Sequence, residues 1–241
     1  MLAGMVLSLA GCVGKGSMIS PLGRPEFVPQ SSPDSAVETG IRQDPNTGGI
    51  LLQWYGTAGA SGYQVFRSDT TDLNNNAVHF TLIINVISSS ALNDTSAVDR
   101  LAAPGIKYHY YIVAVSSDGG HSLPSDTINY ELIDRPTLTA PVNGGAVSRG
   151  AASFGWVNPS GGYTVIRVED ISAEPPAPVW VSHSFQTFVL YPSYQYNFDG
   201  TATQQLVSGQ SYRWRIERFD LDATGRPFDG ATSAWGSFTV N

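Results

Sequence analysis

Apolar and polar residues alternate with a period of two along much of this chain. The clearest stretch is 105–116 (GIKYHYYIVAVS), in which every second side chain from Tyr108 to Ala114 is aromatic or aliphatic. This period, together with the β-branched and aromatic content, predicts a strand. Similar but shorter stretches lie on both sides, separated by Gly-, Asn- and Ser-rich turns, so we expect an all-β protein.

The pattern occurs twice. The stretch 209–220 (GQSYRWRIERFD) places Tyr212 where 105–116 places Tyr108, GYTVIR at 162–167 echoes GYQVFR at 62–67, and Trp156 echoes Trp54. These landmarks keep their order, and each recurs after about a hundred positions, which indicates a tandem repeat. We therefore expect two domains, residues 35–134 and 135–241, each large enough to bury its own core.

About seven short strands are expected in each repeat, which is typical of a β-sandwich. The motifs LQW (52–54), GYQV (62–65), NDT (93–95), PGIKYHY (104–110) and LPS (123–125) resemble those of a fibronectin type III domain. FGW (154–156) and SAWGSFTV (233–240) resemble the fibronectin-type domains of many bacterial surface proteins. The resemblance implies two immunoglobulin-like sandwiches, with Trp54 in the core and Tyr108 at a corner, its hydroxyl bonded to backbone. The fold alone implies no particular function.

The N-terminal stretch has the pattern of an export signal. An apolar run, MLAGMVLSLAG, ends in small residues directly before Cys12, the single cysteine of the chain. Leu9-Ala10-Gly11-Cys12 resembles the lipobox of bacterial lipoproteins. This resemblance implies removal of residues 1–11, acylation of Cys12, and attachment of the protein to the cell envelope through its acyl chains. The absence of Asp after the cysteine favours the outer membrane or cell surface.

Two features of this stretch leave an alternative open. No Lys or Arg precedes Cys12, and the apolar run is short, so we expect the natural start to lie upstream of Met1. The alternative is that Cys12 is an unmodified thiol in an unprocessed segment.

Residues 12–34 are expected to form a proline-rich spacer. Pro21, Pro25, Pro29 and Pro33 recur at every fourth position, which excludes helix. An extended spacer of some twenty residues would reach on the order of 60 Å at about 3.1 Å per residue. Alternatively, Glu26–Val28 forms a first edge strand between Pro25 and Pro29. The junction at 134–136 lacks a Gly/Ser linker, so we expect the two sandwiches to be joined semi-rigidly, end to end.

Charge and motif content narrow the function classes. The net charge is −7, which argues against nucleic acid and anionic headgroups as partners. The four histidines have no metal-ligand spacing, and no nucleophile or phosphate-binding motif occurs, so we expect neither an enzyme nor a cofactor. Asp220 and Asp222 in DLDATG match the opening of a calcium loop, but its twelfth position is Ala231 rather than Glu, which favours an ordinary polar hairpin loop.

The candidate binding surface lies in the second repeat. Residues 185–200 (FQTFVLYPSYQYNFDG) contain six aromatic residues. Tyr194, Tyr196 and Phe198 alternate there and share one face of a strand. If exposed, that face suits a sugar ring or a protein partner; if it points inward, it is core.

The sequence therefore favours a lipid-anchored, non-catalytic envelope protein that acts as a spacer and as an interaction module for a protein or glycan. One alternative is a structural subunit of an envelope or filament assembly that pairs through edge strands. Another is a carbohydrate-binding accessory of a secreted enzyme.

Overall fold

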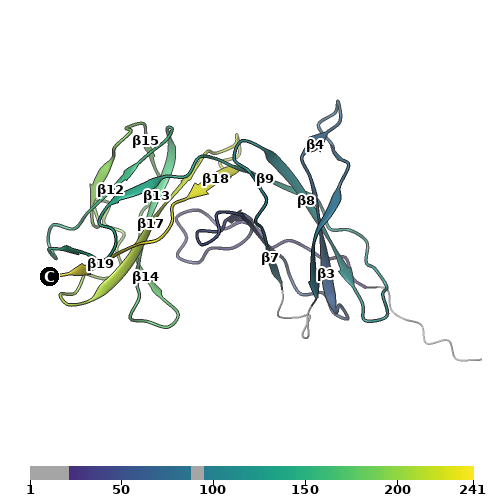
Figure 1. Cartoon of the computed structure of the whole chain (residues 1–241), viewed down its shortest axis with the longest axis horizontal. Coiled ribbons are helices and arrows are strands. Elements are labelled where there is room, and N and C mark those ends of the chain that lie inside the picture. Colours follow the sequence, from purple (N-terminus) through teal and green to yellow (C-terminus); the bar gives the residue numbers. More distant parts are fainter. Residues whose placement is uncertain (1–21, 88–94) are drawn as a thin grey trace, which may run out of the picture.

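The computed structural model describes residues 22–87 and 95–241, and these fold into β-strands, turns and loops. They form two sandwiches placed along the long axis of the molecule (Figure 1). Cys12 and the lipobox lie outside the described residues, as do Asn93 and Asp94. Across the described ranges, no helix is long and apolar enough to cross a membrane.

Sandwich 1 consists of a three-stranded and a four-stranded sheet. The first has the order β1 (Arg42–Gln43), β2 (Ile50–Gln53), β7 (Ser96–Asp99), and the second the order β6 (Thr81–Ile87), β3 (Gly62–Ser68), β8 (Lys107–Val115), β9 (Ile128–Leu132). A small hairpin of β4 (Thr70–Thr71) and β5 (Ala77–Val78) extends beyond β3.

Sandwich 2 repeats this plan. One sheet has the order β10 (Thr137–Ala140), β12 (Ser153–Val157), β16 (Ser193–Gln195). In the other, β13 (Gly162–Asp170) pairs on one side with β14 (Ala177–Val181) and β15 (Phe185–Thr187), and on the other with β17 (Ser211–Phe219), which is followed by β19 (Gly236–Val240) and β11 (Gly145–Val147). The all-β sandwich prediction is confirmed, and the fold is fibronectin type III-like.

The repeated tyrosines have the same role in both sandwiches. The Tyr108 hydroxyl accepts a hydrogen bond from the Ala103 amide (3.2 Å), and the Tyr212 hydroxyl accepts one from the Val207 amide (3.0 Å). Both rings are buried. Each is a tyrosine corner, in which the hydroxyl satisfies a backbone group a few residues upstream. The expectation for Tyr108 is confirmed and extends to its repeat.

A repeated serine was not anticipated from the sequence. The Ile112 amide donates to Ser125 Oγ (3.0 Å), and the Ile216 amide donates to Ser233 Oγ (3.1 Å). In both sandwiches the serine amide in turn donates to the carbonyl of the same isoleucine (2.9 Å). Ile112 and Ile216 therefore mark equivalent positions.

The motifs GYQVFR and GYTVIR are similar in sequence, but they pair with their partner strands in different registers. Val65 pairs with Ile112 in sandwich 1, whereas Ile166 pairs with Ile216 in sandwich 2. The two motifs are thus offset by one residue relative to their partner strands. Since successive side chains point to opposite faces, this shift exchanges the faces: Tyr63 belongs to the core cluster of sandwich 1, whereas Tyr163 is half-buried on the outer face against Phe219.

The two sandwiches share a continuous sheet. β18 (Asp229–Thr232) pairs with β17 of its own sandwich and, in parallel, with β9 of sandwich 1, where Gly230 lies opposite Leu132. β18 therefore joins the larger sheets of both sandwiches. Because backbone hydrogen bonds cross the junction, it is stiffer than a flexible linker would be.

The extended spacer predicted for residues 12–34 is wrong for the part that the structure describes. Phe27 bridges Trp54, the Val28 amide donates to Gln53 (3.0 Å), and the Tyr55 amide donates to Glu26 (2.9 Å). The residues between the prolines retain their amides and carbonyls, so they pair with the strand beside them instead of remaining solvated. This agrees with the alternative of an edge strand at Glu26–Val28.

Candidate functional site

Two of the three residues of the predicted aromatic stripe are half-buried and pack against the core of sandwich 2. The Tyr194 ring stacks on Trp156 (centroids 5.8 Å apart), and the Tyr196 ring meets Trp180 edge-on (5.2 Å) while its hydroxyl donates to Gln204 O (2.7 Å). Phe198 packs against Phe185 and is 42% exposed. The inward alternative therefore describes Tyr194 and Tyr196, and Phe198 alone keeps a substantially open ring.

The neighbouring loop, not the stripe, carries exposed apolar side chains. Four consecutive residues between β15 and β16 are exposed: Phe188, Val189, Leu190 and Tyr191. The loop is held at its base by a hydrogen bond from the Asn158 amide to the Leu190 carbonyl (2.8 Å). An apolar loop tip on a fixed base is typical of a contact surface.

The Asp220–Asp222 loop is a polar hairpin loop. Asp222 Oδ1 accepts hydrogen bonds from the Thr224 hydroxyl (2.7 Å) and from the Thr224 and Arg226 amides (2.8 and 3.0 Å). These bonds hold the pKa of Asp222 below its usual value. In the parts of the chain that the structure describes, no group of three or more His, Cys, Asp or Glu side chains is arranged to hold a metal ion.

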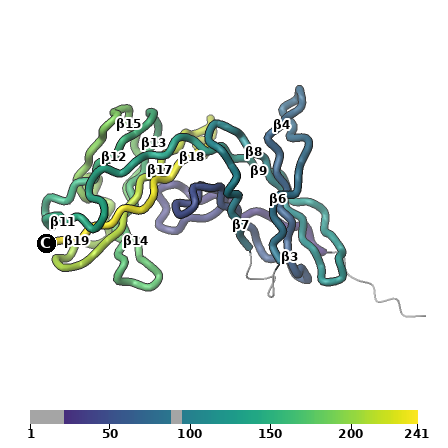
Figure 2. Tube along the Cα trace, in the orientation of Figure 1, coloured from purple at the N-terminus to yellow at the C-terminus, as the bar shows by residue number. Residues whose placement is uncertain are grey.

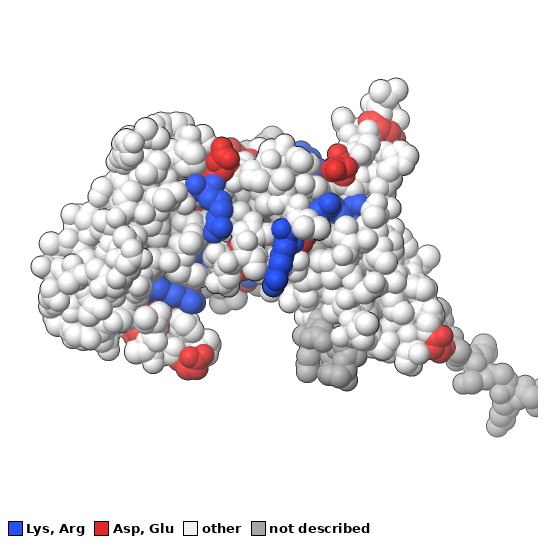
Figure 3. Space-filling view, in the orientation of Figure 1, with Lys and Arg blue, Asp and Glu red and all other residues white. Residues whose placement is uncertain are grey.

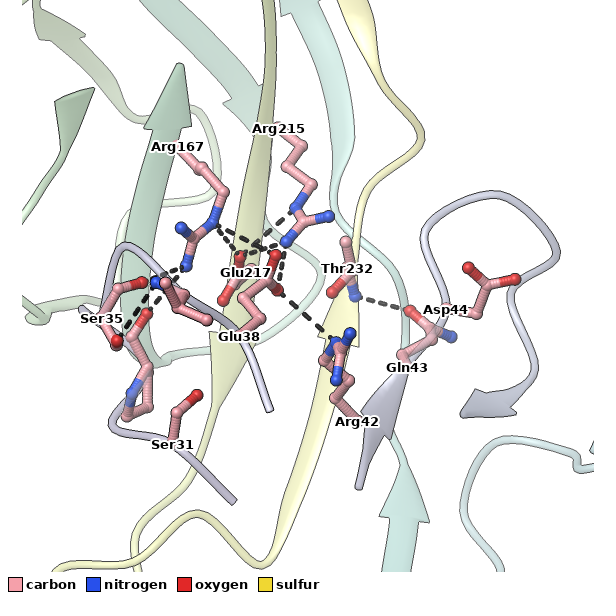
Figure 4. A network of polar contacts seen from close by, with 12 residues as sticks. Ser31, Ser35, Glu38, Arg42, Gln43, Asp44, Arg167, Arg215, Glu217 and Thr232 are labelled. Atoms are coloured by element: carbon pink, nitrogen blue, oxygen red, sulfur yellow. Dashed lines mark hydrogen bonds and ion pairs between the residues drawn. The ribbon is translucent and has the colours of Figure 1, made fainter. Parts of the chain in front are cut away.

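The densest group of charged side chains lies at the junction between the sandwiches (Figure 4). We call it the junction cluster, and it consists of Glu38, Arg42, Arg167, Arg215 and Glu217. β13 and β17 of sandwich 2 supply the last three, while Glu38 and Arg42 come from the N-terminal segment and β1. The side chains of Arg167 and Arg215 are only 1% and 3% exposed.

Cations and carboxylates alternate within the junction cluster. Glu217 Oε1 lies 2.8 Å from Arg167 Nε and 2.7 Å from Arg215 Nη2. Glu38 pairs with Arg215, and its carboxylate also lies 3.7 Å from Arg167 Nε and 3.8 Å from Arg42 Nε. Burial on its own would raise the pKa of Glu217, but Arg215 and Arg167 outweigh it and hold that pKa at about 2. The buried charges are therefore compensated.

The N-terminal segment over residues 30–43, here called the strap, docks on sandwich 2 through this cluster. Arg167 Nη2 donates to the carbonyls of Ser35 (3.0 Å) and Pro33 (3.3 Å). The Thr232 amide donates to Gln43 Oε1 (2.5 Å). Figure 2 shows this purple segment lying between the two sandwiches. A planar guanidinium with several fixed donors suits such a row of carbonyls.

Internal bonds give the strap a fixed shape. The Ser31 amide donates to the Thr39 carbonyl (3.2 Å), and the Thr39 amide donates to Ser31 Oγ (3.1 Å), which closes a compact loop. Gly40 follows with φ +79°, and a Cβ there would lie 2.5 Å from the Gln30 Cα. Only glycine fits this position, so the strap has a defined conformation.

Arginine–tryptophan stacking extends the charged row along β17. The guanidinium groups of Arg213 and Arg215 lie 4.0 and 4.6 Å from the Trp235 ring centroid, and Arg213 pairs with Glu169 (2.6 Å). Such contacts add cation–π attraction to the ion pairs. We did not predict this row, although the alternating Arg213, Arg215 and Glu217 in RWRIERF place three charges on one strand face.

The surroundings of Asp229, at the junction, disfavour the ionised form of its carboxyl group. Asp229 in β18 accepts a hydrogen bond from the Asp220 amide (2.7 Å) and lies opposite Glu131 of β9. Burial, to which the charges of Asp220 and Glu131 add, raises the pKa of Asp229 to about 6. A cavity of about 50 Å³ adjoins it, lined in part by Glu38 and Tyr130.

No protein-family model matches this chain. No curated protein matches it either. Among solved structures it is similar to a fibronectin type III-like protein from Clostridium thermocellum, with 25% identity and a TM-score of 0.33 over 46% of this chain and 92% of that one. It is also similar to the FN1–FN3 domains of chicken CNTN1 (15% identity, TM-score 0.30, 92% of this chain and 67% of that one). A two-domain fibronectin type III segment of chicken tenascin shows 14% identity and a TM-score of 0.27 over 82% of this chain and 93% of that one. The fold assignment above rests on strand order and the two tyrosine corners.

Proposed function

We propose that this chain is a lipid-anchored protein of the bacterial cell envelope that acts without catalysis as a stiff spacer and as an interaction module. The observation that carries the proposal is the junction. A shared sheet, a buried ion cluster and the strap hold the two sandwiches as one body. Fibronectin-like domains commonly act as interaction modules, and a fixed pair presents its outer end at a defined distance from its anchor.

The path of the chain supports this arrangement. Arg24 pairs with Asp126 (2.7 Å) and donates to Pro124 O, just before β9 begins. The other end of β9, at Leu132, contacts sandwich 2. The first described residues thus lie at the end of sandwich 1 remote from the junction, and the C-terminus lies at the far side of sandwich 2 (Figure 1). Acyl chains on Cys12 would tether the pair at one end.

Sandwich 2 offers the contact surface in this proposal. Its exposed loop at residues 188–191 and the half-open Phe198 ring belong to a stretch, 184–198, without a charged residue. Such a surface suits an apolar protein segment or the face of a neutral sugar ring. The glycan version is favoured by an open groove of about 510 Å³ beside Tyr196, whose lining includes the polar residues Gln195, Asn197 and Gln205 together with Arg149.

The deciding experiment is the intact mass of the native protein after extraction from membranes, with sequencing of its N-terminal peptide. We expect a chain that begins at Cys12 and carries acyl groups. A chain that retains residues before an unmodified Cys12 thiol would overturn the anchoring.

A further inference from the structure

The strongest unexplained surface is the open edge of sandwich 1. β6 has seven residues (TLIINVI), none of them charged. Within residues 22–87 and 95–241 it pairs with β3 and with no other strand. Half of the backbone N–H and C=O groups of an edge strand point away from its neighbour and remain open to another strand. The side chain of Ile87 is 90% exposed at the end of this edge.

The equivalent edge of sandwich 2 is protected. There, the strand beside β13 is divided into β14 and β15, separated by residues 182–184. β14 contains Pro178, which has no amide to donate, and two further prolines precede it. Both edges contain a bulge, opposite Val65–Phe66 and opposite Val168–Glu169. The interruption and the prolines therefore distinguish them, and β6 has neither.

The β6 edge also lacks charged side chains, as does the β14–β15 edge, so the interruption and the prolines remain the difference between them. The chain carries a net charge of −7, yet residues 73–93 contain no Asp, Glu, Lys or Arg. Much of the surface of both sandwiches on the face shown in Figure 3 is likewise free of charged side chains. A charged side chain, often Lys, is one of the devices that keep edge strands from pairing, and β6 lacks it. A second acidic copy can approach along this edge without like charges meeting there.

We propose that β6 is a self-association edge, at which two copies of this chain pair their β6 strands antiparallel about a two-fold axis. Such an interface is isologous, since each copy contributes the same strand. Main-chain hydrogen bonds supply the attraction and the apolar side chains extend it. The chain already joins its own sandwiches by strand pairing, between β9 and β18.

The size of the interface sets its strength. A seven-residue strand is about 24 Å long, and one such pair buries less than the roughly 1,200 Å² of a standard stable interface. We therefore expect weak pairing in solution and strong pairing where tethering to a membrane raises the effective concentration. Only this enhancement depends on the proposed anchoring; the pairing itself does not.

The test uses the full chain with its single cysteine. Coupling Cys12 to a maleimide lipid places the protein on neutral vesicles at the proposed anchor, and energy transfer between two dye-labelled populations reports pairing. Asn85→Lys puts a charge on an exposed position of β6. Gln186→Lys is the matched control, because it puts the same charge on an exposed position of β15.

We expect pairing of the unchanged chain and of Gln186→Lys, and pairing at least about tenfold weaker for Asn85→Lys, since a charge on the edge opposes strand addition. Ile87→Lys should repeat that loss, and near-ultraviolet circular dichroism checks that each variant is folded. Absence of transfer for the unchanged chain, or equal transfer for Asn85→Lys, overturns the proposal. Because the lipid is coupled chemically, this result is independent of whether the native protein is acylated.

Discussion

Two nearly identical motifs, GYQVFR in sandwich 1 and GYTVIR in sandwich 2, place their arginines in opposite settings. Arg67 pairs within its own sandwich, with Asp99 (2.8 Å), and lies over the Tyr108 ring. Arg167 is on the outer face, where it pairs with Glu217 and holds the strap. The one-residue shift against the partner strand decides which face each arginine occupies. Similar sequences in a repeat therefore need not have similar roles.

We expect the loss of Arg167 to lower the free energy of unfolding more than the loss of Arg67. Arg167→Ala leaves the Glu217 carboxylate partly uncompensated in a buried site, and we expect the free energy of unfolding to fall by about 3–5 kcal/mol. Urea unfolding measures this. The strap should also become open to limited proteolysis at residues 33–38.

Arg67→Ala is the matched control for that variant. Asp99 keeps hydrogen bonds from the Tyr110 hydroxyl (2.9 Å) and the Leu101 amide (3.0 Å), so we expect a smaller loss of about 1–3 kcal/mol and no change at the strap. Equal losses for the two variants would contradict the assignment of Arg167 to the junction.

Acid should weaken the junction through protonation of Glu217. The pKa of Glu217 is lowered from 4.5 to about 2, so its contribution is complete above about pH 4.5 and is lost as the pH falls toward 2. We expect Glu217→Gln to flatten the fall in unfolding free energy over that window. Glu174→Gln, at an exposed loop position, should leave the profile unchanged; a similar flattening there would contradict the prediction.

The tyrosine corners should behave alike. Tyr108→Phe and Tyr212→Phe each remove a hydroxyl and leave the Ala103 or Val207 amide without that acceptor. We expect each to lower the free energy of unfolding by about 1 kcal/mol. Chemical denaturation of both variants compares the sandwiches directly. A loss confined to one variant would show that the two corners are not equivalent.

Removing the charge of Asp229 should stabilise the chain slightly. Its pKa is raised from 3.8 to about 6, so ionisation costs stability as the pH rises through that range. Asp229→Asn keeps an oxygen for the Asp220 amide, and we expect a gain of about 1 kcal/mol or less at pH 7, after allowance for solvent screening, and none at pH 3. Thermal unfolding at both pH values checks this. A lower free energy of unfolding for Asp229→Asn than for the unchanged chain at pH 7 would contradict this prediction.

The sequence was sufficient for the parts of the structure that depend on local pattern. Alternation identified the strands around Tyr108 and Tyr212, and the resemblance placed the corner at Tyr108, because a strand and its turn are specified by neighbouring residues. The register of 62–67 against 162–167 was not accessible, since it depends on the pairing of distant strands. Likewise, the stripe of Tyr194 and Tyr196 could not be oriented without knowing that Trp156 and Trp180 lie beneath it.

The junction was missed for a related reason. Its members are far apart in the chain, from Glu38 to Glu217, and each one alone resembles an ordinary surface charge. The prolines of residues 25–33 suggested an extended spacer, but proline spacing excludes helix without saying whether a segment is free or docked. The bonds of Glu26 and Val28 to Tyr55 and Gln53, and those of the Pro33 and Ser35 carbonyls to Arg167, show that this segment is held.

The position of the strap in the chain has a consequence for the order of folding. Residues 30–43 are made before most of sandwich 1 and all of sandwich 2, yet their contacts in sandwich 2, Arg167, Arg215 and Thr232, come late in the chain. The contacts of the strap with sandwich 2 can therefore form only once β13, β17 and β18 are in place, since closure over so long a separation follows local folding. A segment that is synthesised before most of both sandwiches is thus among the last to complete its contacts, and its docking marks the completion of the whole body.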